Sequence, residues 1–238
     1  MKIARLALLF LTVLVASGQD PFTDGKSDIP QAEAELREDD TFKVFPDPEG
    51  RGYFPRGKEG YYTKYLSVMK EPSVMASLSQ GVTRVFRFTY LRSFHDPLVF
   101  RIVDKEGELT ATSVRLRRDR EMMTVKIDFQ KTWSLQADVS RRISSLIVQK
   151  DFWKPLNKDE DKLASSGLDG SRWIFEIHDK DGYRLINVWS PDAMVGTENE
   201  MRNAGVDPSK IRNFRIYRDT GCSLLEIGGI LPVPMEIY

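Results

Sequence analysis

Residues 84–90 read Arg-Val-Phe-Arg-Phe-Thr-Tyr, an order that places Phe86, Phe88 and Tyr90 on one side of an extended chain. Apolar residues at every second position are typical of a β-strand with one face on a core. The same period recurs at 98–103, 109–116, 123–129, 173–177 and 183–189. Turn residues separate these segments, and Asp181-Gly182 is a hairpin signal. The chain therefore predicts six antiparallel strands, each with one face on a core.

Three other segments have the period of a helix. Apolar residues recur at steps of three and four between Leu135 and Ile147, which predicts a helix over 136–150. A short helix is expected between Pro72 and Gly81, and a final one between Asp207 and Gly228. Because strands and helices come in blocks, the fold class expected is α+β, an antiparallel sheet of about six strands packed with two or three helices.

The N-terminus has the three parts of a secretory signal. Lys2 and Arg5 precede an uncharged apolar run at 6–16, and small residues follow at 16–18. The run is shorter than the roughly 20 residues that span a bilayer, so cleavage is expected and an uncleaved anchor is the alternative. We expect a signal peptide at 1–18, an acidic, proline-rich flexible spacer at 19–60 and one globular domain at 61–238. The expected location is secreted or periplasmic, with no stable membrane anchor after cleavage.

Composition excludes several functional classes. The chain has 35 basic and 35 acidic residues, a balance that does not favour nucleic acid as a partner. Cys222 is the only cysteine, so no internal disulfide forms, and its apolar helical context predicts a small core residue. No phosphate loop, dinucleotide fingerprint, serine-hydrolase elbow or zinc-protease helix is present. We therefore expect no cofactor.

The best candidate recognition set consists of Arg92, His95, Asp169 and Glu176. Arginine can hold a carboxylate or phosphate through two parallel hydrogen bonds, so this set is a candidate ligand-binding site. The alternative is that Arg92 pairs internally with Asp169 or Glu176 and fixes a loop. The four tryptophans could similarly line a glycan surface, but their positions on apolar strand faces and at a helix end favour core packing.

The two histidines of the chain each precede an aspartate at the end of a predicted strand, in His95-Asp96 and His178-Asp179. Three or four ligands would be needed for a metal, and Asp181 could complete such a set if the two loops met. Turn and capping roles suit the same residues, so no metal site is predicted. A hydrolase that uses a His/Asp or carboxylate site remains an alternative, and it requires the two pairs to converge.

Several segments together resemble a group of uncharacterised exported bacterial proteins. These are 65–73, 87–95, 168–176, 181–191 and 236–238, and the resemblance covers about residues 61–238. The group has no known activity, so the resemblance implies a location and a fold and no catalytic residue. The chain departs from the group at 117–122, where a Gly-Gly-Tyr turn is usual, and at Arg184, where a histidine is frequent.

The function expected from these observations is that of a non-catalytic binding module in the periplasm or cell envelope. Its partner would be an envelope protein or a glycan. The alternatives are the exported hydrolase and a structural protein associated with lipid or cell wall, which would need an exposed apolar patch.

Overall fold

The computed structural model describes residues 34–35, 59–79, 81–93, 95–119, 124–154, 170–191 and 212–229. Its centre is an antiparallel sheet in the order β1-β5-β4-β3-β2-β6-β7. The strands are β1 (Ala34–Glu35), β2 (Val82–Arg92), β3 (Leu98–Lys105), β4 (Glu108–Asp119), β5 (Thr124–Ser134), β6 (Ser171–Asp179) and β7 (Gly182–Trp189). Six long strands and three helices confirm the predicted α+β class. The signal-like segment 1–18 lies outside the described residues, and within 19–60 the pair β1 adds to the edge of β5.

The hairpins form where the sequence predicts them. Glu106 and Gly107, between β3 and β4, have φ angles of 54° and 90°, the left-handed pair that a tight hairpin requires. Gly182 begins β7 with a φ of 94°, and Asp179 Oδ1 accepts a hydrogen bond from the Asp181 amide in the same turn. The β6–β7 turn fixes the register in which Glu176 lies opposite Leu185. The long-range pairing of β2 with β6 places Arg87 opposite Glu176.

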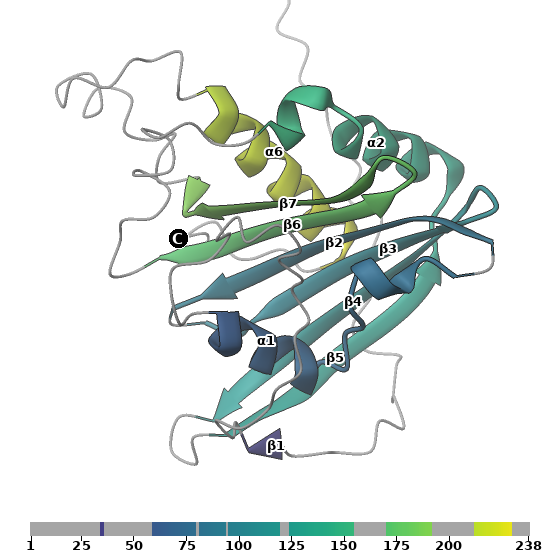
Figure 1. Ribbon diagram of the computed structural model, residues 1–238. Helices are drawn as coiled ribbons and strands as arrows, with labels where there is room; N and C mark the ends of the chain where they lie inside the picture. Colours follow the sequence, from purple (N-terminus) through teal and green to yellow (C-terminus); the bar gives the residue numbers. More distant parts are fainter. Residues whose placement is uncertain are drawn as a thin grey trace, which may run out of the picture. The chain divides into compact units, whose positions relative to one another are not determined.

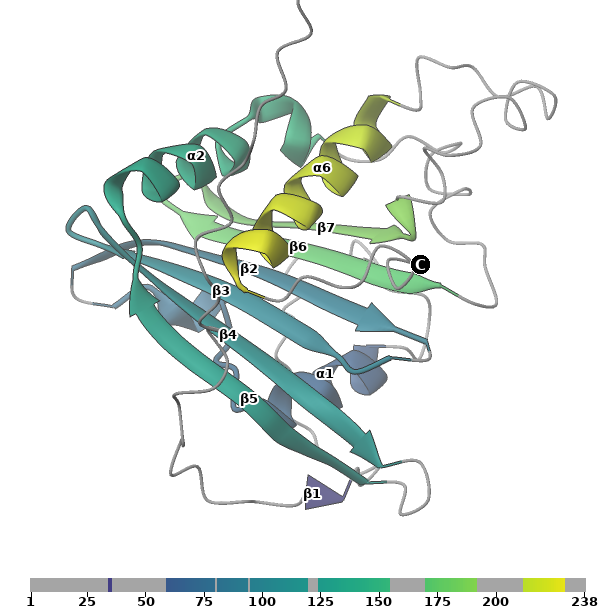
Figure 2. The ribbon, with the colours of Figure 1, turned by 180° about the vertical axis from the view of Figure 1, so that it is seen from behind.

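Helices cover both faces of the sheet (Figures 1 and 2). Helix α1 (Glu59–Val68) lies on one face, and α2 (Ala137–Ile147) and α6 (Arg212–Ile227) lie on the other. The larger apolar core, which includes Phe86, Phe88 and Tyr90, lies on the α2 and α6 face, and a second core with Leu66 and Ile174 lies on the α1 face. The prediction of one face on a core is therefore wrong for the central strands. Their polar positions, such as Arg87 and Thr89, are buried under the second layer.

Most helices agree with the sequence pattern. α2 lies within the expected segment 136–150, the short turn η2 (Lys150–Trp153) follows it, and α6 ends just before Gly228. Gly221 faces Trp173 so closely that a Cβ atom would collide with the indole ring, so a glycine is needed there in the middle of a helix. Cys222 packs half-buried against the larger core, as expected. No helix in the described ranges is long and apolar enough to cross a bilayer.

The helix expected between Pro72 and Gly81 is wrong. Only one turn forms there, η1 (Met75–Ser77), and the longer helix α1 precedes it. The carbonyl oxygen of Pro72 accepts a hydrogen bond from Arg87 Nη1 at 2.7 Å, and that of Val74 lies 3.3 Å from His178 Nδ1. These carbonyls bind side chains of the sheet, so the segment crosses the sheet as a strap. We call residues 69–79 the strap.

Candidate functional site

Among the described recognition residues, Arg92 and His95 lie near the same end of β2, and Glu176 lies apart from them. Glu176 lies opposite Arg87 on the α1 face, whereas Arg92 lies opposite Ser171, five residue steps or about 16 Å further along β2, on the other face. His95 follows β2 at the Arg92 end, where Arg92 Nη2 donates a hydrogen bond to the Asp96 carbonyl at 3.2 Å. Asp169 lies outside the described residues. The alternative of an internal ion pair between Arg92 and Glu176 is also not found, since the two side chains lie on different faces of the sheet.

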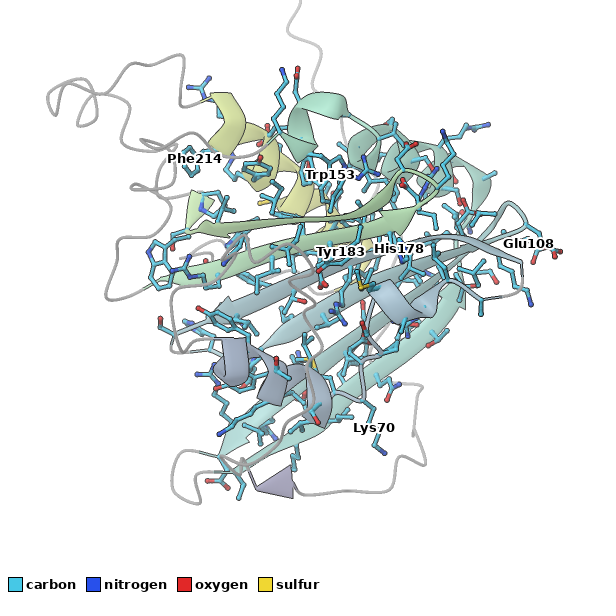
Figure 3. All side chains as sticks on the ribbon, in the orientation of Figure 1. Lys70, Glu108, Trp153, His178, Tyr183 and Phe214 are labelled. Atoms are coloured by element: carbon cyan, nitrogen blue, oxygen red, sulfur yellow. The ribbon has the colours of Figure 1, made fainter. Side chains whose placement is uncertain are left out.

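The two His/Asp pairs lie at opposite ends of β2. His178 is opposite Val85 near its start, and His95 follows its last residue, Arg92, so at least seven steps or about 23 Å separate them. The side chain of His178 contacts the strap through Val74 and lies edge-on to Tyr183 (Figure 3). Across the described ranges no three metal-ligating side chains form a group. The convergence that a His/Asp hydrolase requires is therefore not found.

A buried ion cluster occupies the α1 face beneath the strap. It consists of Glu71, Arg87, Arg101, Glu176 and Tyr183. Arg87 Nε donates to Glu176 Oε2 at 2.7 Å, and both side chains are fully buried. Arg101 Nε donates to Glu71 Oε2 at 3.0 Å, and the Tyr183 hydroxyl donates to Glu176 Oε1 at 2.8 Å.

The electrostatics of the buried ion cluster follow from its burial. Desolvation raises the pKa of Glu71, although Arg101 and Arg87 pull it down. Burial alone would lower the pKa of Arg87, but Glu176 and Glu71 outweigh it and leave that pKa raised, so the guanidinium stays charged. Because Arg87 and Glu176 are sealed from solvent, the cluster fastens the strap to the sheet and offers no surface to a substrate.

A cleft opens on the opposite face, between the end of α2 and the turn from β6 to β7. Its volume is about 560 Å³, within the range of small-molecule sites. We call it the Arg84 cleft. Its walls are apolar on one side and charged on the other, and they comprise Leu78, Val82, Thr83, Arg84, Ile147, Val148, Asp179, Lys180, Asp181 and Arg184.

The charged wall contains one arginine that is not neutralised. Arg184 Nη2 donates to Asp179 Oδ2 at 2.7 Å, and Lys180 Nζ lies 3.2 Å from Asp181 Oδ1. Arg84 is half-buried, and its Nε atom is buried without a hydrogen-bond partner among the residues that the structure describes. A buried donor without a partner is costly, and the Nε atom of Arg184 in the same wall is also buried without one in the described part of the chain.

The apolar wall of the Arg84 cleft is unusually open to solvent. Val148, directly after α2, is 54% exposed, the one large apolar side chain so exposed within the described ranges. Nearby, the guanidinium of Arg184 lies over the Trp153 ring, 5.4 Å from its centroid, which orients Arg184 along the rim. The cleft thus combines apolar contact area with a small number of polar groups, as ligand sites do.

The sequence pattern did not identify the Arg84 cleft. Arg84 begins the alternating stretch of β2 and looks like a solvated residue at a strand end, and Arg184 stands out only because it differs from the histidine of the resembling group. The cleft depends on the position of the α2 C-terminus over β2, which no local pattern encodes. The other sequence feature that could have indicated the cleft was the cluster of charges at the Asp179–Gly182 turn.

Comparison with known proteins gives no match to a family model and no match to a curated protein.

Proposed function

We propose that this protein is an exported, non-catalytic binding module of the cell envelope, and that the Arg84 cleft is its ligand site. The observation that carries the proposal is the open cleft of about 560 Å³ that joins an exposed apolar wall to an arginine without an ion-pair partner among the described residues. The signal-like N-terminus supports export. A hydrolase built on the two His/Asp pairs receives no support, because β2 separates them.

The proposal is tested by asking what the full-length protein retains when it is produced in its native cells. Val148→Trp fills the mouth of the Arg84 cleft at an exposed position, so folding should be affected by less than about 0.5 kcal/mol. Arg141→Trp is the matched control, since Arg141 is exposed on α2, the helix that ends just before Val148, and does not line the cleft. The measurement is mass spectrometry of compounds that co-purify with each protein.

We expect a compound that the wild type and Arg141→Trp retain and that Val148→Trp loses. If the three proteins carry the same compounds, or none of them carries any, the cleft is not a ligand site and the proposal fails.

A further inference from the structure

The chemistry of the Arg84 cleft indicates what class of ligand it takes, an inference that rests on the proposed function. The charged wall contributes Arg84, Lys180 and Arg184 against Asp179 and Asp181. Two of the three cations are paired with the two carboxylates within the wall. Arg84 remains without a salt bridge among the described residues, so it is the cation of this wall that can pair with an acid from outside.

The surroundings of Arg84 limit how much negative charge a ligand can bring. Asp104 lies opposite Arg84 on β3, and its Oδ1 atom accepts a hydrogen bond from the Gly107 amide, so it stays directed to its own turn. Asp179 follows His178, the partner of Val85, so it lies on the neighbouring strand beside Arg84, and Asp181 follows in the turn. The three carboxylates balance the three cations of the site, so one negative charge can pair with Arg84, whereas a second one has no cation left to pair with and is repelled.

The apolar wall determines the rest of the ligand. Leu78 comes from the strap, Val82 from the start of β2, and Ile147 and Val148 from the end of α2. These side chains are aliphatic, and their removal from water on binding favours an aliphatic partner by about 25 cal/mol per Å². No aromatic side chain lines the cleft among the described residues, so a stacked sugar or base is not favoured.

We propose that the Arg84 cleft binds a monoanionic carboxylate with an aliphatic body, such as a medium-chain fatty acid. The acid group binds the terminal amino groups of the Arg84 guanidinium, since Nε is buried. The aliphatic chain lies along Leu78, Val82, Ile147 and Val148. A charge-assisted hydrogen bond of this kind is about twice as strong as a neutral one, and so Arg84 sets the specificity for an acid.

The test uses the full-length protein and three ten-carbon probes below their micellar concentrations. Decanoate carries one charge, decanamide has the same shape without charge, and decyl phosphate carries two charges near neutral pH. Binding is measured by calorimetry. We expect saturable, stoichiometric binding of decanoate, with decanamide and decyl phosphate each weaker by about tenfold or more.

Variants locate the site. Arg84→Gln should weaken decanoate binding by about 10- to 100-fold, and Arg84→Lys, which keeps the charge, should retain most of it. Arg117→Gln is the control, because Arg117 is an exposed arginine of β4 outside the cleft, and it should bind as the wild type does. Val148→Trp should abolish binding.

The outcomes separate this inference from the proposed function. If decanamide binds as tightly as decanoate, or Arg84→Gln binds decanoate as the wild type does, the carboxylate inference is wrong while the cleft remains a ligand site. If no probe binds but Val148→Trp still loses a native compound, the ligand class is wrong and the proposed function stands. If no probe binds and no native compound depends on Val148, both are wrong.

Discussion

Arg87 places a charge inside the sheet layer, where an isolated ion would be strongly unfavourable. Its Nε atom binds Glu176 and its Nη1 atom binds the Pro72 carbonyl, both at 2.7 Å. Glu176 is also held by Tyr183. Each residue is therefore stable as an ion because the other is present, and the loss of one partner leaves a buried charge uncompensated.

We expect Arg87→Met to lower the free energy of unfolding by about 3–5 kcal/mol, because it leaves Glu176 buried without its counter-ion. The double variant Arg87→Met/Glu176→Leu removes both charges and should be more stable than Arg87→Met alone. Urea unfolding followed by tryptophan fluorescence measures both. If the double variant is no more stable than Arg87→Met, the uncompensated charge of Glu176 is not the cause of the lost stability.

At the scale of elements, the strap is the unusual part of the fold. Glu71 fastens its start to Arg101, Pro72 to Arg87 and Val74 to His178, while Leu78 at its end lines the Arg84 cleft. The buried ion cluster on one face thus holds an element that forms a wall of the cleft. A change in the charge of Glu71 is expected to act on the strap first.

The raised pKa of Glu71 gives a pH dependence with a definite sign. Because burial raises this pKa above its ordinary 4.5, the folded state binds a proton more readily than the unfolded chain does. The stabilisation from protonation is complete below pH 4.5 and is lost as the pH rises through the folded pKa. Glu71→Gln does not titrate, so the wild type should gain stability relative to this variant as the pH falls from 7 towards 4.5.

Urea midpoints of the two proteins, measured in steps across that pH range, give the comparison. Glu108→Gln, at an exposed position of β4, is the control and should follow the wild type. A stability difference that does not change with pH, or that changes in the opposite direction, would mean that Glu71 is not desolvated beneath the strap.

The elements show which structural information lies in the sequence. Alternation located the strands β2 to β7 and the three-to-four period located α2 and α6, because both patterns are local. The layer on the α1 face was not foreseen, since Arg87 and Glu176 look like solvated strand positions until the register places them opposite each other. The strap segment was predicted as a helix because a local pattern does not show its long-range hydrogen bonds to Arg87 and His178.

The candidate site depended even more on long-range structure. His95, Arg92 and Glu176 were chosen by residue type, and the sheet separates Glu176 from the other two. Arg84 carries no signal in its own neighbourhood, because the cleft forms only where α2, β2 and the β6–β7 turn meet. Residue type alone therefore does not show which side chains the fold brings together.

At the scale of the molecule, the two faces of the sheet differ in how their charged side chains are arranged. The α1 face is closed over the buried ion cluster, and its charges bind one another. The α2 and α6 face has the larger core and the Arg84 cleft at the margin of that core. Charges are therefore sealed on one side of the sheet, and an open, partly charged cleft lies on the other.

Hydrogen exchange of the full-length protein, with and without a lipophilic extract of its native cell envelopes, tests the central claim most directly. Binding in the Arg84 cleft predicts slower exchange at the start of β2, at the β6–β7 turn and at the end of α2. The same extract should leave these segments unchanged in Val148→Trp. Protection confined to the α1 face, or no protection at all, would contradict a ligand site in the Arg84 cleft.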